Sequence, residues 1–191
     1  MTGTAMDQPL IWVDLEMTGL DPETEVIVEI AVIVTDGQLD VTQEGPDLVI
    51  HADEDVLGRM HSRVKQMHGQ SGLTEAIRHS ALTTQQAEEE VLAFVKTHVS
   101  TAGSAPLAGN SVHADRAFMR RYMPTLEAYC HYRNVDVSTL KELARRWYPG
   151  VVDAAPVKAG DHRALADIKE SIDELRYYRD QLFVPPRNDP A

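Results

Sequence analysis

Residues 10–17 read LIWVDLEM and residues 25–37 read EVIVEIAVIVTDG, two mostly apolar runs joined by a short segment that contains glycine, aspartate and proline. The first run alternates apolar residues on one face, and the second is rich in β-branched residues, so both are predicted to be strands. DLVIHAD at residues 47–53 is a third, shorter run of this kind. The short connections predict that the three strands form an antiparallel meander.

The rest of the chain alternates helical and extended patterns. Thr83 and Gln86 form a capping-box pattern at the start of the clearest helix. The resulting order, βββαβαβα, predicts one α/β domain at residues 10–183, a mixed sheet in which the antiparallel three-strand meander is followed by βα units with helices on the faces. Residues 1–9 and 184–191 are expected to be flexible ends. The expected elements are a weakly helical region at 53–80, helices at 83–99, 113–123, 139–148 and 161–182, and strands at 105–111 and 134–139.

Net charge limits the functions that this chain can have. The 191 residues carry a formal charge of −12. A protein that binds long DNA or RNA non-specifically needs a basic surface, so the negative charge argues against binding of this kind. The sequence has no apolar run long enough to span a membrane and no signal-peptide pattern at its start. We therefore expect a cytoplasmic protein that does not associate with a membrane. The single cysteine, Cys130, is expected to pack in the core as a small hydrophobic residue without a chemical role.

Acidic residues interrupt several of the expected elements. Asp14 and Glu16 lie two apart on the first strand, so their carboxylates point to the same face. Asp115 and Asp167 lie near the starts of two helices, the latter five residues after His162. A solvated strand face and helix-capping acids are the structural alternatives. A pair of like charges at a strand end is costly unless a cation or a proton shares it.

Four carboxylates on separate elements, with one histidine beside the last, suit a particular kind of chemistry. Oxygen-rich sets of this kind hold two divalent cations for in-line attack at a phosphorus atom. Zinc would be expected to recruit more histidine or cysteine. The spacing alone leaves this two-metal interpretation and the structural alternatives open.

Three sequence strings carry a specific resemblance. WVDLEMTGLD at 12–21, GNSVHADRAF at 109–118 and HRALADIKESI at 162–172 resemble the three exonuclease motifs of the DEDD superfamily, in its histidine-containing branch. With HYRNVDVSTLKELARRWYP at 131–149, the chain is similar to the oligoribonuclease family from about Leu10 to Phe183. The resemblance implies a ribonuclease H-like fold and a 3′-to-5′ exoribonuclease that degrades very short RNA, chiefly dinucleotides, to 5′-mononucleotides.

The resemblance also implies roles for the acids. Asp14, Glu16 and Asp167 would bind the first Mg²⁺ or Mn²⁺, Asp14 would bridge to a second ion, and Asp115 would hold that second ion. His162 would act as general base on the metal-bound water. An imidazole with a pKa near its usual value of about 6.5 can accept that proton around neutrality.

Further residues match positions that the family uses for substrate. Leu20 would wedge between the two bases. A cap on the 5′ phosphate would measure length, because a longer chain would have to pass through it. Arginine suits such a cap by its bidentate fork, and hydroxyl groups at a helix start add donors. The residues implied for the cap are Ser111, Arg133, Ser138 and Thr139.

A second subunit is also implied. In the family the HYR segment reaches the active site of the partner, so Tyr132 and Arg133 would act in trans in a homodimer. His68 aligns with a family histidine that contacts the scissile phosphate or the metal-bound water. Arg63 stands where many members carry tryptophan, five residues before that histidine, and its planar guanidinium can still stack on a base.

Three other functions remain as alternatives. One is an exonuclease of the same superfamily on longer RNA or DNA, and another is a two-metal phosphatase on small esters. The third is a catalytically dead nucleic-acid adaptor, which would typically lack one of the acids, whereas this chain retains all four and His162.

Overall fold

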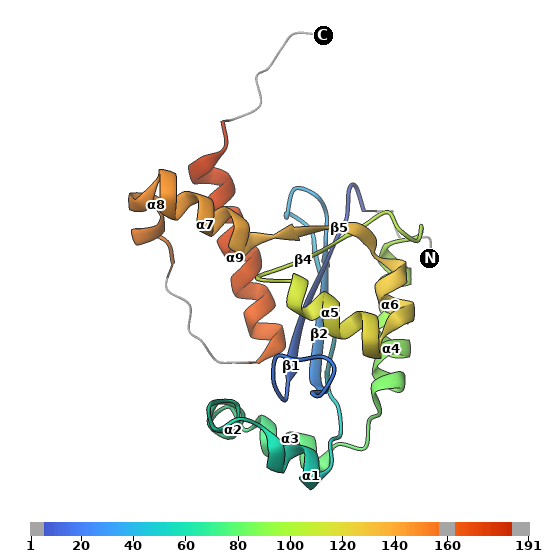
Figure 1. Ribbon diagram of the computed structural model, residues 1–191. Coiled ribbons are helices and arrows are strands. Elements are labelled where there is room, and N and C mark those ends of the chain that lie inside the picture. Colours follow the sequence, from blue (N-terminus) through green and yellow to red (C-terminus); the bar gives the residue numbers. More distant parts are fainter. Residues whose placement is uncertain (1–5, 157–162, 185–191) are drawn as a thin grey trace.

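The computed structural model describes residues 6–156 and 163–184, and at its centre lies a five-stranded mixed sheet with the strand order β3-β2-β1-β4-β5 (Figure 1). β1 pairs antiparallel with β2 and β2 antiparallel with β3, whereas β4 runs parallel to β1 and to β5. The predicted α/β class, the meander and the βα units are therefore confirmed. The strands are β1 (Leu10–Met17), β2 (Ile27–Thr35), β3 (Thr42–Val49), β4 (Pro106–Gly109) and β5 (His131–Asp136).

Helices cover both faces of this sheet. One core cluster joins one face of β1 and β2 to α4, α5 and α6, and a second joins the opposite face to α7 and α9 (Figure 1). None of the described helices has the length and apolar character that a membrane crossing requires. The helices in the described part of the chain are α1 (Glu54–Arg59), α2 (Ser62–Gln70), α3 (Leu73–His79), α4 (Thr84–His98), α5 (His113–Tyr122), α6 (Pro124–Tyr129), α7 (Val137–Trp147), α8 (Pro149–Asp153) and α9 (Ala164–Leu182).

Several strand boundaries differ from the prediction, and the structure shows the cause of two of these differences. β3 begins at Thr42 rather than at residue 47, because its polar first half pairs with the end of β2 although it lacks an apolar pattern. β5 ends at Asp136 and does not reach residue 139. Here the Asp136 side chain accepts the backbone N–H of Ser138 at 2.9 Å and so caps α7.

Two prolines that directly follow the expected helices at 113–123 and 139–148 begin new helices. Pro124 and Pro149 occupy the first turns of the short helices α6 and α8, where the missing N–H costs nothing. His162 and most of the two expected flexible ends lie outside the described residues.

The face of β1 that carries Asp14 and Glu16 is not a solvated one. Trp12 shares that face and is fully buried, and its indole N–H donates to the Thr35 hydroxyl at 3.0 Å. α9 packs over this face, so the structural alternative of a solvated strand face is wrong.

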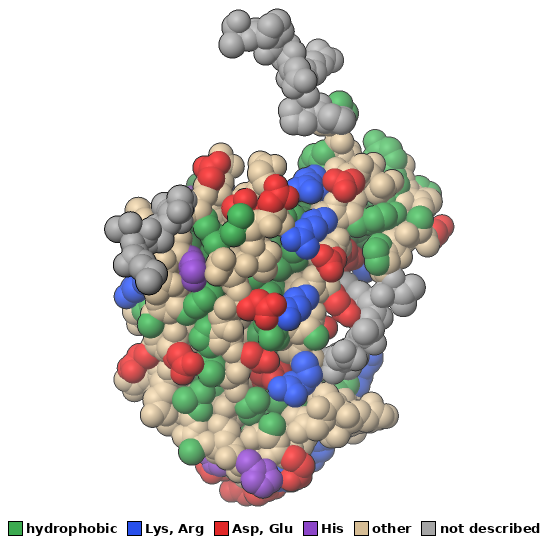
Figure 2. Space-filling view, turned by 180° about the vertical axis from the view of Figure 1, so that it is seen from behind, with side chains coloured by type: hydrophobic (Ala, Val, Ile, Leu, Met, Phe, Trp, Pro, Cys, Tyr) green, Lys and Arg blue, Asp and Glu red, His purple; other side chains and the backbone are tan. Residues whose placement is uncertain are grey.

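On the side of the molecule opposite to the view of Figure 1, Lys and Arg side chains are interspersed with Asp and Glu (Figure 2).

Candidate active site

Three carboxylates meet where the end of β1 approaches the start of α9. Asp14 and Glu16 project from the same face of β1, and Asp167 lies in the first turn of α9. One oxygen of each carboxylate lies within 4.8 Å of the others. α9 crosses the sheet here because its apolar stripe, which includes Ile168 and Ile172, packs into the core on this face. The structure thus brings together residues that are far apart in the sequence.

The electrostatics of this cluster favour the uptake of a cation. Burial, followed by repulsion from Asp115 and Asp167, raises the pKa of Asp14 well above its usual value. Burial and repulsion from Asp167 raise the pKa of Glu16 to about 8. In the absence of positive charge these groups hold protons, and a divalent cation would take the place of those protons. Three carboxylates fit a hard cation with oxygen ligands better than zinc.

Asp115 stands beside this cluster at the start of α5. Its Oδ1 accepts the backbone N–H of Leu15 at 3.0 Å, which ties α5 to β1 between Asp14 and Glu16. Burial raises the pKa of Asp115 to about 7, although the N–H from Leu15 acts in the opposite direction. Asp115 therefore adds a further buried acid next to Asp14, from a separate element.

Of the two histidines expected at the site, the structure describes one. His68 on α2 is buried, its Nε2 lies 2.9 Å from the carbonyl oxygen of Met17, and its Nδ1 lies 3.8 Å from Oε2 of Glu16. α2 thus delivers a histidine to the edge of the acidic cluster, as the sequence similarity predicts. His162 lies outside the described residues.

Sequence reasoning missed a buried ion pair that supports the cluster. Glu29 on β2 lies opposite Glu16 in the strand register and is fully buried. Its Oε1 accepts from Arg163 Nε at 2.8 Å and pairs with Arg163 Nη2 at 2.6 Å, and its Oε2 accepts the Ala164 N–H at 3.2 Å. Glu29 thereby holds the start of α9. The available signal was a lone acid within the apolar run of residues 25–37.

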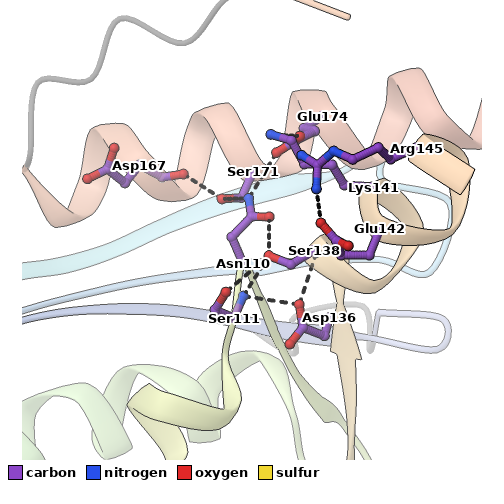
Figure 3. A network of polar contacts seen from close by, with 10 residues as sticks. All are labelled: Asn110, Ser111, Asp136, Ser138, Lys141, Glu142, Arg145, Asp167, Ser171 and Glu174. Carbon is purple, nitrogen blue, oxygen red and sulfur yellow. Dashed lines mark hydrogen bonds and ion pairs between the residues drawn. The ribbon is translucent and has the colours of Figure 1, made fainter. Parts of the chain in front are cut away.

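Two hydroxyl groups of the expected phosphate cap lie together. The Ser111 and Ser138 Oγ atoms are 3.2 Å apart, and the Ser111 N–H donates both to Ser138 Oγ and to Asp136 Oδ1 at 3.0 Å (Figure 3). Ser111 adopts a left-handed backbone conformation with φ of 52°, which is uncommon for a residue other than glycine. Such backbone strain is typical of ligand-binding sites, where the surrounding bonds hold it in place.

The remaining candidates line more exposed surfaces. Leu20 is 87% exposed, as a wedge for bases requires, and Tyr132 is 72% exposed on the edge strand β5. The Arg133 guanidinium lies over the Tyr132 ring at 5.1 Å. Thr139 is exposed and lines a cavity of about 880 Å³ beside α7, which Asn134 and Phe183 also line.

Comparison with protein families gives one match over most of the chain. The family described as Exonuclease (RNase_T) matches residues 11–175. The curated relatives include an oligoribonuclease from Rhodococcus jostii, 54% identical over 94% of this chain and 90% of its own length. A second, from Corynebacterium glutamicum, is 58% identical over 94% and 82%. A third, named mitochondrial oligoribonuclease, from Homo sapiens, is 51% identical over 95% and 76%.

Solved structures with the same fold are more distant in sequence. The zinc-bound E. coli exonuclease I–ssDNA complex superposes with a TM-score of 0.70 at 13% identity, over 93% of this chain and 41% of that chain. The exonuclease I of Methylocaldum szegediense superposes with a TM-score of 0.66 at 19% identity, over 91% and 41%. The chain thus spans about two fifths of these exonucleases, and the likeness concerns the fold.

Proposed function

The chain belongs to the RNase_T exonuclease family and, within it, to the oligoribonucleases, and from that premise we propose that it removes 5′-mononucleotides from the 3′ ends of very short RNAs, chiefly dinucleotides. It is an exoribonuclease that hydrolyses phosphodiester bonds. The observation that carries the proposal is the meeting of Asp14, Glu16 and Asp167, with their ligand oxygens within 4.8 Å of one another. The acidic end of β1 is where the 3′-terminal phosphodiester would bind.

Two divalent ions, Mg²⁺ or Mn²⁺, are proposed for each active site. Asp14, Glu16 and Asp167 would hold the first ion, and Asp14 and Asp115 the second. The raised pKa values of the buried acids support this, because a site that holds protons without positive charge gains most from a cation. When bound, such ions lower the pKa of a water and neutralise charge that develops at the phosphorus.

His162 is proposed as the general base. In the sequence it directly precedes Arg163, the residue that Glu29 binds at the start of α9. An imidazole of ordinary pKa accepts a proton near neutral pH without a large free-energy cost. His68, which lies beside Glu16, is proposed to contact the scissile phosphate or the attacking water.

A preference for short substrates is proposed to come from residues outside the acidic cluster, which would bind the bases and the 5′ phosphate. Leu20 would separate the two bases. The Ser111 and Ser138 hydroxyls, 3.2 Å apart, support a terminal-phosphate cap there. The full set proposed for the cap is Ser111, Arg133, Ser138 and Thr139.

We further propose a homodimer in which Tyr132 and Arg133 act in the partner's active site. Their exposure on an edge strand supports this, because unpaired strand edges and exposed aromatic side chains favour association. The cytoplasm is the proposed compartment, although the human relative is named mitochondrial.

Product analysis tests the function. A 5′-labelled dinucleotide and a 5′-labelled 20-nucleotide RNA are incubated with the full chain in Mn²⁺, in Mg²⁺ and in EDTA. We expect rapid conversion of the dinucleotide to nucleoside 5′-monophosphate, slow attack on the long RNA, and no reaction in EDTA.

Each alternative function has its own outcome in this assay. Equal rates on the two RNAs would contradict the preference for short substrates and favour an exonuclease on long chains. Release of inorganic phosphate would favour a phosphatase. Absence of any product would favour a nucleic-acid adaptor.

A further inference from the structure

We propose that Asn110 is a positioning residue that sets the preference for short substrates, by holding the Ser138 side of the site at a constant distance from the helix that carries Asp167. This inference rests on the proposed function. Asn110 follows β4 and lies between α7 and α9, with its side chain at the centre of a polar network (Figure 3). The sequence analysis placed Asn110 in the expected strand at 105–111 and gave it no functional role.

The orientation of the Asn110 amide follows from its neighbours. Its Nδ2 donates to Ser171 Oγ at 2.8 Å and to Glu174 Oε2 at 3.0 Å. The Glu174 carboxylate also accepts from Lys141 Nζ at 3.1 Å, so in its charged form it can only accept. The amide nitrogen must therefore face α9, and Oδ1 must face Ser138.

The network continues from Asn110 to the helix of Asp167. The Ser171 hydroxyl donates its one proton to the carbonyl oxygen of Asp167 at 2.7 Å, so it accepts from Asn110. On the other side, the Ser138 hydroxyl donates to Asn110 Oδ1 at 3.0 Å. An unbroken series of hydrogen bonds thus joins the start of α7 to the first turn of α9.

This arrangement decides which hydroxyl can donate to a terminal phosphate. The backbone N–H groups of Ser111 and Ser138 both donate to Asp136 Oδ1, so these two donors are occupied. The proton of Ser138 is committed to Asn110. The Ser111 hydroxyl, which contacts Ser138 Oγ at 3.2 Å, can rotate toward a ligand. Asn110 therefore makes Ser138 an acceptor that orients Ser111.

A constant distance between the acidic cluster and the phosphate cap would select for substrates of one length. The 3′-terminal diester binds at Asp167 and the 5′ phosphate at Ser111, and the Asn110 network fixes the distance between their elements. A misplacement of about 1 Å at such a site costs a large factor in rate. Loss of the Asn110 hydrogen bonds would weaken the binding of a dinucleotide and leave the hydrolysis of longer chains unchanged.

The test is the ratio of kcat/KM on a 5′-phosphorylated dinucleotide to kcat/KM on a 5′-phosphorylated pentanucleotide, with the full chain in Mn²⁺. Asn110→Ala is expected to lower this ratio about tenfold, the factor that a hydrogen bond of typical net strength provides, through KM for the dinucleotide. kcat on the pentanucleotide should remain near that of the wild type. Thermal melting checks the fold of each variant.

A swap of groups provides the rescue. Asn110→Asp keeps the shape and the acceptor for Ser138 but loses the donors, so it should also lower the ratio, and it decides the test if Asn110→Ala does not fold. Adding Glu174→Gln to Asn110→Asp restores an amide–carboxylate pair in the reverse direction and should return the ratio to within about threefold of the wild type. The matched control is Asp173→Asn, which changes an exposed acid on α9 that pairs with Arg176 outside the network of Figure 3 and should leave the ratio unchanged.

The outcomes separate the inference from the function on which it rests. A wild type that favours the dinucleotide, with Asn110→Ala retaining that preference, would overturn the inference alone. Equal losses on both substrates would also overturn it, because they indicate general damage. A wild type without any preference would overturn both the short-substrate proposal and this inference.

Discussion

Glu16 illustrates how one side chain at this site depends on its surroundings. Its carboxylate lies near Asp167, and His68 approaches it to 3.8 Å from α2. Burial is the largest cause of its raised pKa, so moving the residue to the surface would abolish most of the effect. The same carboxylate is proposed as a metal ligand, and protons and cations therefore compete for it.

The stability of the metal-free protein should depend on pH in a predictable direction. The pKa of Glu16 rises from 4.5 to about 8 and that of Asp115 from 3.8 to about 7. Between the unfolded and the folded pKa values the native state binds more protons, so the free energy of unfolding falls as pH rises from about 4 to about 8. Below this window both states are protonated and the effect vanishes.

Thermal melting in EDTA at pH 5 and pH 8 measures this effect. Each kcal/mol lost should lower the melting temperature by about 2–4 °C in a chain of this size. Glu16→Gln, which cannot titrate, should reduce the difference, and Mn²⁺ should restore stability at pH 8. An equal pH dependence in Glu16→Gln and wild type would count against the assignment.

Asp14 should be indispensable for catalysis but not for folding. Asp14→Asn removes one negative charge from the proposed metal ligands and should reduce turnover about 100-fold or more. The melting temperature in EDTA should stay the same or rise, because repulsion from Asp115 and Asp167 is relieved. Glu90→Gln, an exposed change on α4, is the control. Near-normal turnover of Asp14→Asn in Mn²⁺ would refute the role of Asp14.

At the scale of the elements, the start of α9 is the part that the site depends on most. Glu29 from β2 binds both the guanidinium of Arg163 and the N–H of Ala164, and so satisfies an otherwise unpaired donor of the first turn. Arg163 is partly exposed whereas Glu29 is fully buried. Loss of the arginine therefore leaves a buried charge with less compensation, whereas loss of the glutamate leaves a cation that can reach water.

Arg163→Ala should accordingly destabilise the fold by about 1–3 kcal/mol, less than the loss of a fully buried pair because the guanidinium is partly exposed. Adding Glu29→Gln should recover part of this loss, since a neutral amide costs less to bury. Urea unfolding of the two single variants and the double variant gives the coupling free energy. A free energy of unfolding for Arg163→Ala within about 0.5 kcal/mol of wild type would show that the pair does not anchor α9.

For the whole molecule, charge and exposed surface indicate what it can bind. The net charge of −12 disfavours a long polyanion, whereas a substrate with one or two phosphates can be held by cations and a local cap. Aromatic side chains are exposed at Tyr132 on β5, at Trp147 at the end of α7 and at Tyr148, which follows it. Such surfaces are typical of association with another protein.

Mixing two inactive variants tests the proposed dimer. The Asp14→Asn subunit has a damaged acidic cluster but keeps Tyr132. The Tyr132→Ala subunit keeps the acidic cluster but lacks the tyrosine. If Tyr132 acts in trans, random subunit exchange should restore about a quarter of wild-type activity, because half of the dimers contain one complete site of two.

A matched control uses Asp14→Asn with Glu16→Gln, both in the same cluster, and should show no recovery. Sedimentation measures the oligomeric state of each sample. A monomeric, fully active wild type would contradict the trans arrangement.

Much of the fold was predictable from local patterns. The alternation in residues 10–17 placed Asp14 and Glu16 on one face, and the Thr83–Gln86 capping box marks the start of α4 as the structure has it. The predicted start of β3 was wrong because pairing with β2 sets it. The predicted end of β5 was wrong because Asp136 caps the next helix there. Patterns of period two or 3.6 report only neighbours along the chain.

The sequence by itself determined the α/β class, the family and the set of acidic residues. Only the tertiary structure decided that Glu29 anchors α9, that Ser111 takes a left-handed conformation, and that Asn110 links α7 to α9. These features depend on partners distant in the chain. The contacts of Glu29 and Asn110 follow from how α9 packs across the sheet, whereas Ser111 is held by Asp136 and Ser138. Hydrogen-bond direction is defined only once both partners are in place.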